Sequence, residues 1–276
     1  MQAPKISIIT PSYNQGQFIE ETIASVLDQN YPNLEYIVVD GGSKDNTLDI
    51  IRKYEHRLSY WVSEKDGGQS EAINKGFKRA TGDIIAWLNS DDILLPGALH
   101  RVAEALTTGG LDLVNGYTVV IDENSNILTS HFTLKQKKWY AKRGIYYLNQ
   151  PAMFWKRSIL EKVGYLKEDF HTEMDKELLI RIFEQDYKIG QLHQILAGFR
   201  IHGQSKTGGD DSQVQKWFRQ DQAKLLKLYT DTYGQKPTTL NKCIYGLEKL
   251  LKGIYLKKWL FTKKWRGKNV RELASA

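Results

Sequence analysis

Short apolar runs alternate with helical patterns in the first part of the chain. The runs 5–10 (KISIIT), 34–39 (LEYIVV) and 83–88 (DIIAWL) are almost continuously apolar and β-branched, which is typical of strands buried in a parallel sheet. Shorter strands are expected at 60–62 and 112–115. The intervening segments carry apolar residues at helical spacing. The pattern predicts βαβ units and therefore an α/β fold, in which helices flank a Rossmann-like, mostly parallel central sheet.

Polar clusters follow three of these expected strands. They lie at 10–14 (TPSYN), 40–43 (DGGS) and 89–92 (NSDD). In a doubly wound sheet the carboxyl ends of the parallel strands share one edge, and ligands bind beyond that edge. We therefore expect the three clusters to converge on one ligand site.

The pattern changes after Gly116. Residues 117–121 and 127–132 predict a hairpin, and residues 188–192 and 196–201 predict two further strands. Helical spacing occupies the rest of this part and predicts C-terminal helices, at 159–163, 178–183, 217–233 and 240–259.

Composition excludes several classes of protein. Of the 276 residues, 41% are apolar and 26% charged, which excludes a disordered chain, a collagen-like fibre and a coiled coil. The longest apolar stretches, 6–9 and 84–88, are far shorter than the roughly 18 residues of a membrane-spanning helix. Cys243 is the only cysteine, which excludes an intrachain disulfide and a multi-cysteine zinc site. No charged-then-apolar leader precedes the first strand, so we expect a cytoplasmic protein.

The positive charge is concentrated at the end of the chain. Residues 236–276 hold eleven Lys and Arg against two Glu, a net charge of +9, whereas the rest of the chain carries −2. Aromatic residues among the lysines suit an anionic membrane surface or a nucleic acid. The alternative is a helix that packs apolar residues on the body and leaves a solvated basic face. We expect the first half of this tail to pack, through Ile244, Leu247, Leu251 and Ile254, and about the last 15 residues to make the contact.

Two acidic positions at strand ends are candidates for ligand binding. Asp91 and Asp92 repel each other unless a cation lies between them, and hard carboxylate oxygens suit Mg²⁺ or Mn²⁺. The alternative for this pair is a helix cap. Asp40, which precedes two glycines, can accept hydrogen bonds from a ribose or a base, or can simply form a tight turn.

Two later positions are candidates for the chemistry itself. Asp175 lies beside other acidic residues at the start of a helical segment, where it is a candidate general base or a charge favoured by the helix dipole. His202 follows a strand-like run and can complete a metal site, or can be a solvated surface histidine. Near it, Arg200 or Lys206 can neutralise a phosphate.

Four ordered motifs resemble one family. TPSYN, VVDGGSKDNT, EKDGGQSEAINKGFKRATGDIIAWLNSDD and NQPAMFWKRSILEKVGYL together are similar to an inverting family 2 glycosyltransferase (GT2) with a GT-A fold. The resemblance is strong over residues 6–96, moderate over 150–206, and slight after 208. Three positions depart from it, because Gly41 and Asn89 replace acidic residues found in many members and Met174 replaces a Glu.

The resemblance implies a role for each matching residue. Asp91, Asp92 and His202 would hold a divalent metal, Mn²⁺ or Mg²⁺, on the donor diphosphate. Asp175 would deprotonate the acceptor hydroxyl. Asp40 would pair with the base. The other donor-binding residues would border the nucleotide or its sugar, and they are Pro11, Tyr13, Asn14, Asp66, Gly67, Asn74, Asn89, Ser90 and Asp91.

The resemblance also implies an activity and a domain organisation. The expected reaction moves a sugar, as in a hexosyltransferase, from a nucleotide-sugar donor such as a UDP-sugar to a hydroxyl of a saccharide or lipid-linked acceptor. Such a step is expected in bacterial surface polysaccharide synthesis. A contact of the basic tail with the inner face of the plasma membrane is a separate hypothesis, which rests on the +9 charge and the tryptophans of the tail. The GT-A domain would span 1–235, with a nucleotide-binding half (1–116) and an acceptor-side half (117–235), before the basic amphipathic tail 236–276.

Two other classes of protein are alternatives to a glycosyltransferase. A nucleotidyltransferase that makes activated sugars uses a basic, glycine-rich loop after its first strand, and residues 10–17 contain no basic residue. A non-catalytic module that binds a nucleotide sugar or a nucleic acid is the remaining alternative. The acidic clusters at the strand ends would repel a phosphate backbone, so no nucleic-acid partner is expected.

Overall fold

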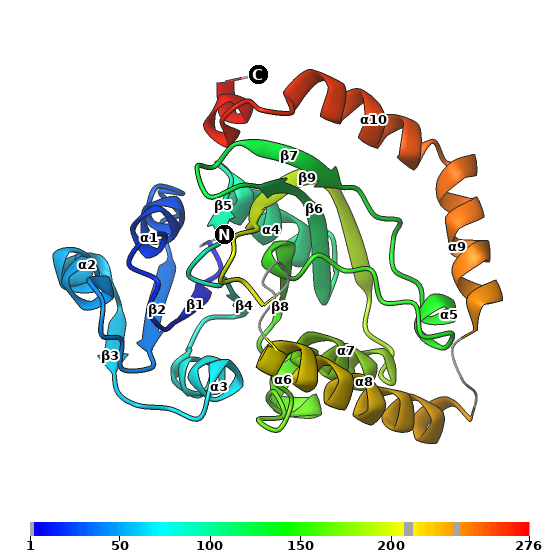
Figure 1. Cartoon of the computed structure of the whole chain (residues 1–276), viewed down its shortest axis with the longest axis horizontal. Helices are drawn as coiled ribbons and strands as arrows, with labels where there is room; N and C mark the ends of the chain where they lie inside the picture. Colours follow the sequence, from blue (N-terminus) through cyan, green and yellow to red (C-terminus); the bar gives the residue numbers. More distant parts are fainter. Residues whose placement is uncertain (1–2, 207–211, 235–237, 276) are drawn as a thin grey trace.

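A mixed sheet runs through the computed structural model, which describes residues 3–206, 212–234 and 238–275 (Figure 1). Within these residues the sheet has nine strands in the order β3-β2-β1-β4-β8-β6-β9-β5, with β7 paired to β6. Its parallel half consists of β1 (Ile6–Ser12), β2 (Leu34–Asp40), β3 (Tyr60–Ser63) and β4 (Ile84–Trp87). The strands predicted at 5–10, 34–39, 60–62 and 83–88 are therefore confirmed, with small shifts at their ends.

The second half of the sheet is mostly antiparallel. It contains β5 (Ile93–Leu94), β6 (Leu113–Ile121), β7 (Ile127–His131), β8 (Met153–Lys156) and β9 (Ile189–Arg200). β8 pairs antiparallel with both β4 and β6, and β9 runs parallel to β6. The hairpin predicted after Gly116 is confirmed as β6 and β7.

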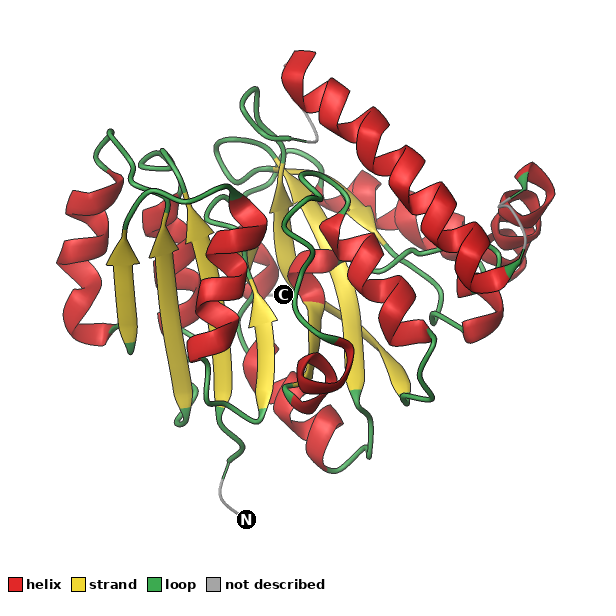
Figure 2. Ribbon diagram, turned by 90° about the horizontal axis from the view of Figure 1, so that it is seen from below, coloured by secondary structure: helices red, strands yellow, loops and turns green. Residues whose placement is uncertain are grey.

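Helices cover both faces of the sheet (Figure 2). One face packs against α1 (Ile19–Leu27), α2 (Thr47–Tyr54) and α4 (Ala98–Thr107). The other packs against α3 (Gln69–Arg79), α6 (Ser158–Val163), α7 (Met174–Phe183) and α8 (Ser212–Tyr233). The fully buried isoleucines of β1 show why this strand is apolar on both sides, since Ile6 and Ile8 point to the first layer and Ile9 to the second.

The structure corrects three boundaries predicted from the sequence. The strands expected at 112–115 and 117–121 form one strand, β6, and those expected at 188–192 and 196–201 form one strand, β9. The helix expected at 240–259 is broken at Gly253, whose φ of +66° favours glycine, into α9 (Thr239–Leu251) and α10 (Ile254–Trp265).

The end of the chain returns to the sheet. α9 and α10 follow one another along the outer edge of the second half of the sheet (Figure 1). Trp265 and Val270 are buried against Val119 and Ile127, and Asn269 forms an isolated β-bridge with Asn126. The last part of the tail therefore packs on the body, contrary to the expectation that it would be the free segment. Among the residues that the structure describes, no helix combines the length and apolarity that crossing a bilayer requires.

Candidate active site

The loops after β1 and β2 are joined by hydrogen bonds. The Asn14 backbone N–H donates to the Ser43 hydroxyl at 2.7 Å, and the Asn14 side-chain oxygen accepts from the Lys44 N–H at 2.8 Å. Asn14 has a φ of 51°, a left-handed conformation that asparagine tolerates better than most residues. The first two polar clusters therefore meet at one edge of the sheet, as the sequence predicts.

Two predicted donor-binding residues flank this junction. Pro11 is buried within β1 and pairs in register with Val39. Its predicted contact with the nucleotide stays a prediction. Tyr13, two residues later, is 60% exposed and presents its ring at the edge. The ring is thus the more accessible of the two for a ligand.

The Asp40 side chain is fully buried and accepts hydrogen bonds from its own loop and from β3. Its carboxylate accepts the backbone N–H groups of Gly42 and Ser43, at 3.0 and 2.9 Å, and the hydroxyl of Ser63 at 2.6 Å. These contacts correspond to the turn that the sequence left open as the alternative. The pairing of Asp40 with a base stays a prediction.

Asp66 lies against the same loop. A Cβ atom on Gly41 would come within 2.9 Å of Asp66 Oδ2, so a larger residue at position 41 would displace the Asp66 side chain. Asp66 Oδ1 accepts the Gly68 N–H at 2.9 Å, and burial raises the pKa of the Asp66 carboxyl. The neighbouring Gly67 N–H donates to Glu71 at 2.7 Å. Asp66 and Gly67 therefore lie where the loops after β2 and β3 meet.

Asn74 has a different environment from the one predicted. On α3 its amide N–H group donates to the Leu166 carbonyl at 2.9 Å and to Glu168 at 3.0 Å, and its oxygen accepts the Leu166 N–H at 3.0 Å. The side chain is buried and holds the segment before α7 in place. This geometry does not support the predicted contact of Asn74 with the donor.

Asp91 and His202 come together from distant parts of the chain. The distance between Asp91 Oδ2 and His202 Nε2 is 3.1 Å. His202 is 6% exposed, and its ring centroid lies 4.5 Å from that of Phe18. His202 is therefore held in place beside the acidic cluster, and is not the solvated histidine of the alternative interpretation.

Asp92 is turned away from this pair. Its Oδ1 accepts the Arg200 backbone N–H at 2.9 Å, and its Oδ2 accepts the Asn89 side-chain N–H at 3.3 Å. Burial, followed by the nearby Asp91 charge, raises the pKa of the Asp92 carboxyl well above its ordinary value. The two carboxylates therefore lie near each other with different partners, Asp91 with His202 and Asp92 with Arg200 and Asn89, and the role of Asp92 as a metal ligand stays a prediction.

The Asp91–His202 pair suits a divalent cation. One carboxylate oxygen and one imidazole nitrogen are ligands that Mn²⁺ accepts, and such ions take further ligands from phosphate and water. No group of three or more His, Cys, Asp or Glu side chains within the described part of the chain forms a metal site. The protein therefore offers a pair of ligands, which fits a cation that is completed by a bound diphosphate.

Arg200 has a structural role, which corrects the suggestion that it neutralises a phosphate. Its side chain is fully buried and forms an ion pair with Glu21 at 2.6 Å. Its guanidinium also donates to the backbone oxygens of Asp91 and Asp122, at 2.8 and 2.9 Å. Because every direction of this group is occupied, Arg200 fixes the backbone under Asp91 and does not face a ligand.

A chain of side-chain amides crosses the end of β4. Asn89 accepts from Gln69 at 2.8 Å and donates to Gln150 at 3.3 Å, and Gln150 donates to the Trp87 carbonyl at 2.8 Å. Lys206 continues the chain by donating to Gln69 at 2.8 Å. The neighbouring Ser90 is buried, and its carbonyl accepts from Thr22 at 2.9 Å. Sequence reasoning does not single out Gln150, although it lies within the NQPAMFW motif.

Asp175 lies in the first turn of α7. Its Oδ1 accepts the Lys176 N–H at 2.8 Å, and burial raises the pKa of its carboxyl. Met174, the position that departs from the family pattern, packs in the core, whereas the preceding Glu173 is buried and pairs with Lys176 at 2.5 Å. Asp175 is thus a carboxylate with a raised proton affinity on a fixed helix, which is the property that a general base needs.

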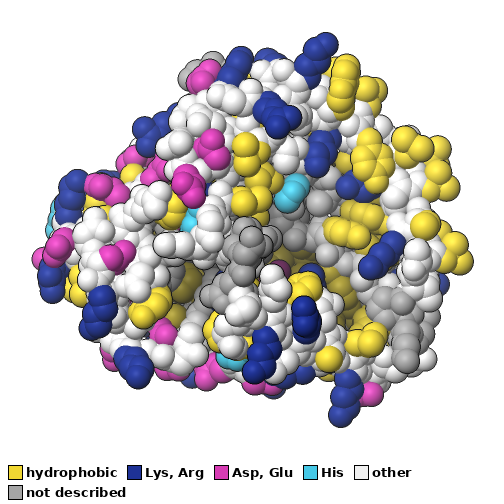
Figure 3. Space-filling view, in the orientation of Figure 1, with side chains coloured by type: hydrophobic (Ala, Val, Ile, Leu, Met, Phe, Trp, Pro, Cys, Tyr) yellow, Lys and Arg dark blue, Asp and Glu magenta, His cyan; other side chains and the backbone are white. Residues whose placement is uncertain are grey.

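Lys206 connects the two sides of the site. Its ammonium group, which contacts Gln69 on α3, also donates to the His171 carbonyl at 2.7 Å, just before α7. The segment that carries Asp175 is therefore tied to the edge that carries Asn89 and Asp91. Figure 3 shows a hollow near the centre of the molecule, between the parallel half of the sheet and the C-terminal helices.

Comparison with known proteins shows the family to which the chain belongs. Residues 7–164, more than half of the chain, match the family described as Glycosyl transferase family 2. The chain belongs to glycosyl transferase family 2. An uncharacterized glycosyltransferase of Rickettsia prowazekii is 30% identical over 227 residues, which cover 78% of this chain and 70% of the relative.

A second relative of the family 2 chain carries a more specific name. A Bacillus subtilis protein named for teichuronic acid biosynthesis is 46% identical over 92 residues, which cover 32% of this chain and 36% of that one. The first relatives and solved structures found are longer, and the family 2 chain spans about two thirds of their length.

Two solved structures share the fold of this family 2 chain. S. aureus TarS 1–349 in complex with UDP-GlcNAc matches with a TM-score of 0.65 at 19% identity, over 85% of this chain and 68% of that one. The mannosyltransferase PcManGT of Pyrobaculum calidifontis, in complex with GDP-Man and Mn²⁺, matches with a TM-score of 0.58 at 17% identity, over 95% and 84%. The predicted GT-A fold is confirmed.

Asp221 is a residue of this family 2 chain that sequence reasoning missed. It is fully buried on α8, and its Oδ2 accepts the backbone N–H groups of His171 and Thr172, at 2.9 and 2.7 Å, and the Thr172 hydroxyl at 2.9 Å. Its spacing offers a signal, because Asp221 lies four residues before Leu225 and so occupies the buried face of an amphipathic helix. Asp221 holds the segment that leads into Asp175.

Replacing Asp221 by Ala is expected to lower the free energy of unfolding by at least about 1–3 kcal/mol, because buried N–H groups lose their acceptor. Chemical denaturation measures this loss. Asp231→Ala, an exposed position on the same helix, is the control and is expected to leave the free energy unchanged within about 0.5 kcal/mol. Equal stability of the two variants would contradict the role of Asp221.

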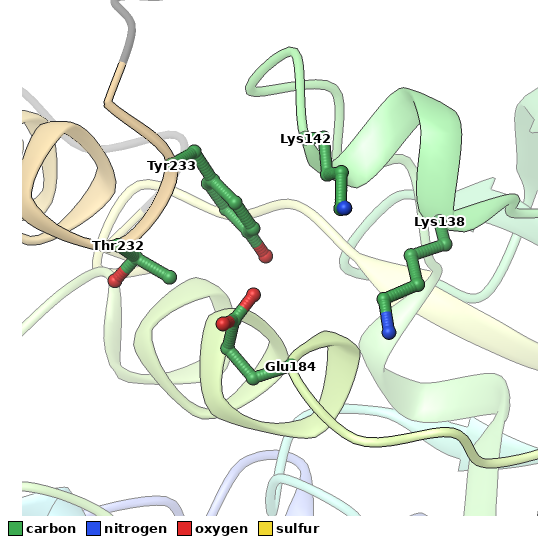
Figure 4. A pocket seen from close by; sticks show the side chains of 5 residues that line it. All are labelled: Lys138, Lys142, Glu184, Thr232 and Tyr233. Atoms are coloured by element: carbon green, nitrogen blue, oxygen red, sulfur yellow. The ribbon is translucent and has the colours of Figure 1, made fainter.

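A cavity of about 230 Å³ lies apart from the site of this family 2 chain (Figure 4). It lies between α8, the end of α7 and the short helix α5 (Lys138–Ala141), and the Tyr233 hydroxyl and the Glu184 carboxylate point toward each other within it. Its lining contains none of the predicted site residues, and consists of Lys138, Lys142, Glu184, Thr232 and Tyr233. The cavity is therefore separate from the predicted site at the edge of the sheet.

Proposed function

We propose that this chain is an inverting, metal-dependent hexosyltransferase. In this proposal it moves a sugar from a nucleotide-sugar donor, a UDP-sugar, to a hydroxyl of a saccharide or lipid-linked acceptor in the synthesis of a bacterial surface polysaccharide. The observation that carries the proposal is the Asp91–His202 pair at the ligand edge of the sheet, tied through Lys206 to the segment that leads into Asp175. The names of the similar proteins, which bind UDP-GlcNAc or GDP-Man, support a nucleotide-sugar donor.

Donor binding and acceptor binding are assigned to different halves of the chain in this proposal. We propose that residues 1–116 bind the nucleotide and that residues 117–235 form the acceptor side, followed by the basic tail 236–276. The donor would lie against the loops that carry Tyr13, Asn14 and Asp66. The acceptor would approach from the side of α7, because Asp175 must reach its hydroxyl.

Asp175 acts as the base in this proposal. The acceptor oxygen forms a bond to the anomeric carbon of the donor, the bond from that carbon to the diphosphate oxygen breaks, and the acceptor proton passes to Asp175. A positioned base contributes roughly 10²–10⁴-fold to such a step. One displacement with no carboxylate nucleophile inverts the configuration at the anomeric carbon.

Asp91 and His202 would hold the divalent cation in this proposal. A cation bound there supplies charge neutralisation on the diphosphate leaving group. Arg200 fixes the backbone of Asp91 through a hydrogen bond to its carbonyl. The amide chain through Asn89 fixes the end of β4. The chain's own contribution is therefore a rigid pair of ligands, set before the donor arrives.

A donor hydrolysis assay tests the proposed function without knowledge of the acceptor. The full chain is incubated with a panel of nucleotide sugars in the presence of Mn²⁺, Mg²⁺ or EDTA, and released nucleotide is measured. We expect metal-dependent release from one donor, a UDP-sugar. No release from any donor, together with no thermal shift by any nucleotide, would overturn the proposal in favour of a non-catalytic module.

The pH dependence of transfer is expected to reflect Asp175. A base must be deprotonated to act, and burial raises the pKa of this carboxyl above its ordinary value of 3.8. The rate should therefore be constant at high pH and fall tenfold per unit as the pH drops below this raised pKa. A profile of kcat against pH, measured at saturating donor and metal, checks this; a midpoint at or below 3.8 would contradict the assignment.

A further inference from the structure

The outer face of α9 is apolar and uncovered. Leu240 is 68% exposed and Leu251 is 78% exposed, although both lie within an ordered helix. The exposed apolar residues of α9 recur at helical spacing and form one stripe, which consists of Leu240, Ile244, Leu247, Leu250 and Leu251. The opposite face of the helix meets the body through Tyr245, which is buried against Tyr140. An apolar stripe on the solvent side of a helix marks a contact with something outside the chain.

The outer face of α10 continues this surface beyond Gly253. Ile254 and Trp265 are buried and attach α10 to β7 and its neighbours. The exposed apolar residues lie on the other side of the helix, and they are Tyr255, Leu256, Trp259 and Leu260. Figure 3 shows hydrophobic side chains gathered with Lys and Arg over the edge of the molecule that α9 and α10 occupy.

The surroundings of these apolar residues are strongly basic. Exposed lysines lie on both helices and in the turn between them, among them Lys242, Lys252, Lys263 and Lys264. In the described residues of the tail the acidic groups are Glu248 and Glu272, and Glu248 is paired with Lys137 and Lys252, at 3.2 and 2.9 Å. The surface therefore presents unpaired positive charge beside leucine and tryptophan.

We propose that the outer face of α9 and α10, residues 240–264, docks on the surface of an anionic lipid bilayer. Leucine and tryptophan side chains enter the boundary between headgroups and acyl chains, while the lysines contact lipid phosphates. The core of a protein–protein interface is depleted in lysine, so this mixture favours a lipid surface over a second protein. The helices lie along the membrane and do not cross it.

This surface differs from the one that the sequence indicated. Ile244, Leu247 and Leu251, which were expected to pack on the body, are the exposed residues. Trp265 and Val270, in the segment expected to be free, are buried. The inference goes beyond the proposed function, because the docking surface shares no residue with the Asp91–His202 site.

Vesicle co-sedimentation of the full chain tests the proposal. Vesicles of phosphatidylcholine alone are compared with vesicles that also contain about 30% phosphatidylglycerol, at low and high salt. We expect the chain to pellet with the anionic vesicles, at least about tenfold more strongly than with the neutral ones, and to be released in part by salt. No binding to the anionic vesicles would overturn the proposal.

Two sets of substitutions locate the contact. Each is expected to weaken the partition onto anionic vesicles by at least about tenfold. The apolar set is Leu247→Gln, Leu251→Gln and Trp259→Gln. The basic set is Lys242→Gln, Lys263→Gln and Lys264→Gln. The matched control, which changes an exposed leucine on α8 and should bind as the original chain does, is Leu226→Gln.

Light scattering and donor hydrolysis complete the test. A chain that is dimeric, becomes monomeric with the apolar set and ignores vesicles would overturn the proposal in favour of a second copy of this chain. Unchanged vesicle binding by both sets would overturn it as well. The basic set keeps the test valid if the apolar set does not fold. Donor hydrolysis in solution is expected to be unchanged by both sets, so a failure of membrane binding is distinguishable from a failure of the proposed transferase activity.

Discussion

Replacing Asp175 by Asn is expected to lower kcat for sugar transfer by about 10²–10⁴-fold, because the amide cannot take the proton of the acceptor hydroxyl. The carboxyl lies in the first turn of α7, on a segment held by Asp221, so the substitution changes the proton acceptor and leaves its position intact. Steady-state kinetics with a saturating acceptor measure the loss. The Kd of the donor is expected to be unchanged.

Asp169→Asn is the matched control for this substitution. Asp169 lies six residues before Asp175, and its side chain is exposed and pairs with Lys224 at 2.9 Å. Its replacement should leave kcat within about twofold, since exposed ion pairs contribute little. Normal turnover in the Asp175→Asn variant would remove this residue from the mechanism, whereas loss of donor binding would assign it to the donor site.

Replacing Asp91 by Ala is expected to weaken metal-dependent donor binding by at least about 10–100-fold. The reason is that Asp91 and His202 are the pair that faces the ligand edge, and either residue alone is a poor site for a divalent ion. Isothermal titration of the nucleotide diphosphate with and without Mn²⁺ measures the effect. His202→Gln should reproduce most of it.

The Asp92→Asn variant separates ligation from support. Asn keeps the acceptor for the Arg200 N–H, and the raised pKa of Asp92 shows that its environment disfavours the charge in any case. We therefore expect little change in the metal dependence of donor binding. A loss equal to that of Asp91→Ala would assign Asp92 to the metal, as the sequence predicts. Normal affinity with Mn²⁺ in the Asp91→Ala variant would remove Asp91 from the metal site.

The parallel half of the fold was predictable because its signals are local. Each apolar run that became β1, β2 or β4 is a short continuous segment, and its burial on both faces needs no partner beyond the helices between the strands. The convergence of TPSYN, DGGS and NSDD follows from the direction of the strands alone. The same argument placed Asp91 at the edge of the sheet.

Residues whose roles depend on distant partners were not predictable. Arg200 resembles a phosphate ligand in sequence. In the structure its guanidinium is buried and pairs with Glu21, which lies 179 positions away. Asn74 sits within the motif that carries the resemblance, yet it binds Leu166, 92 positions away. The continuity of β9 was hidden by His193 and Gln194, the polar residues between the two predicted strands. Gln191 and Ile195 on either side of them pair with β6, so the strand continues across a local irregularity in register.

Glu21 on α1 pairs with two arginines that lie much later in the sequence. It receives Arg200 at 2.6 Å and Arg271 at 3.2 Å, so the first helix is held by residues 179 and 250 positions later. During synthesis on the ribosome, α1 gains these two neighbours only after residues 200 and 271 have emerged. A truncation that removes Arg271 therefore also removes a contact of α1, the helix that follows the loop carrying Tyr13.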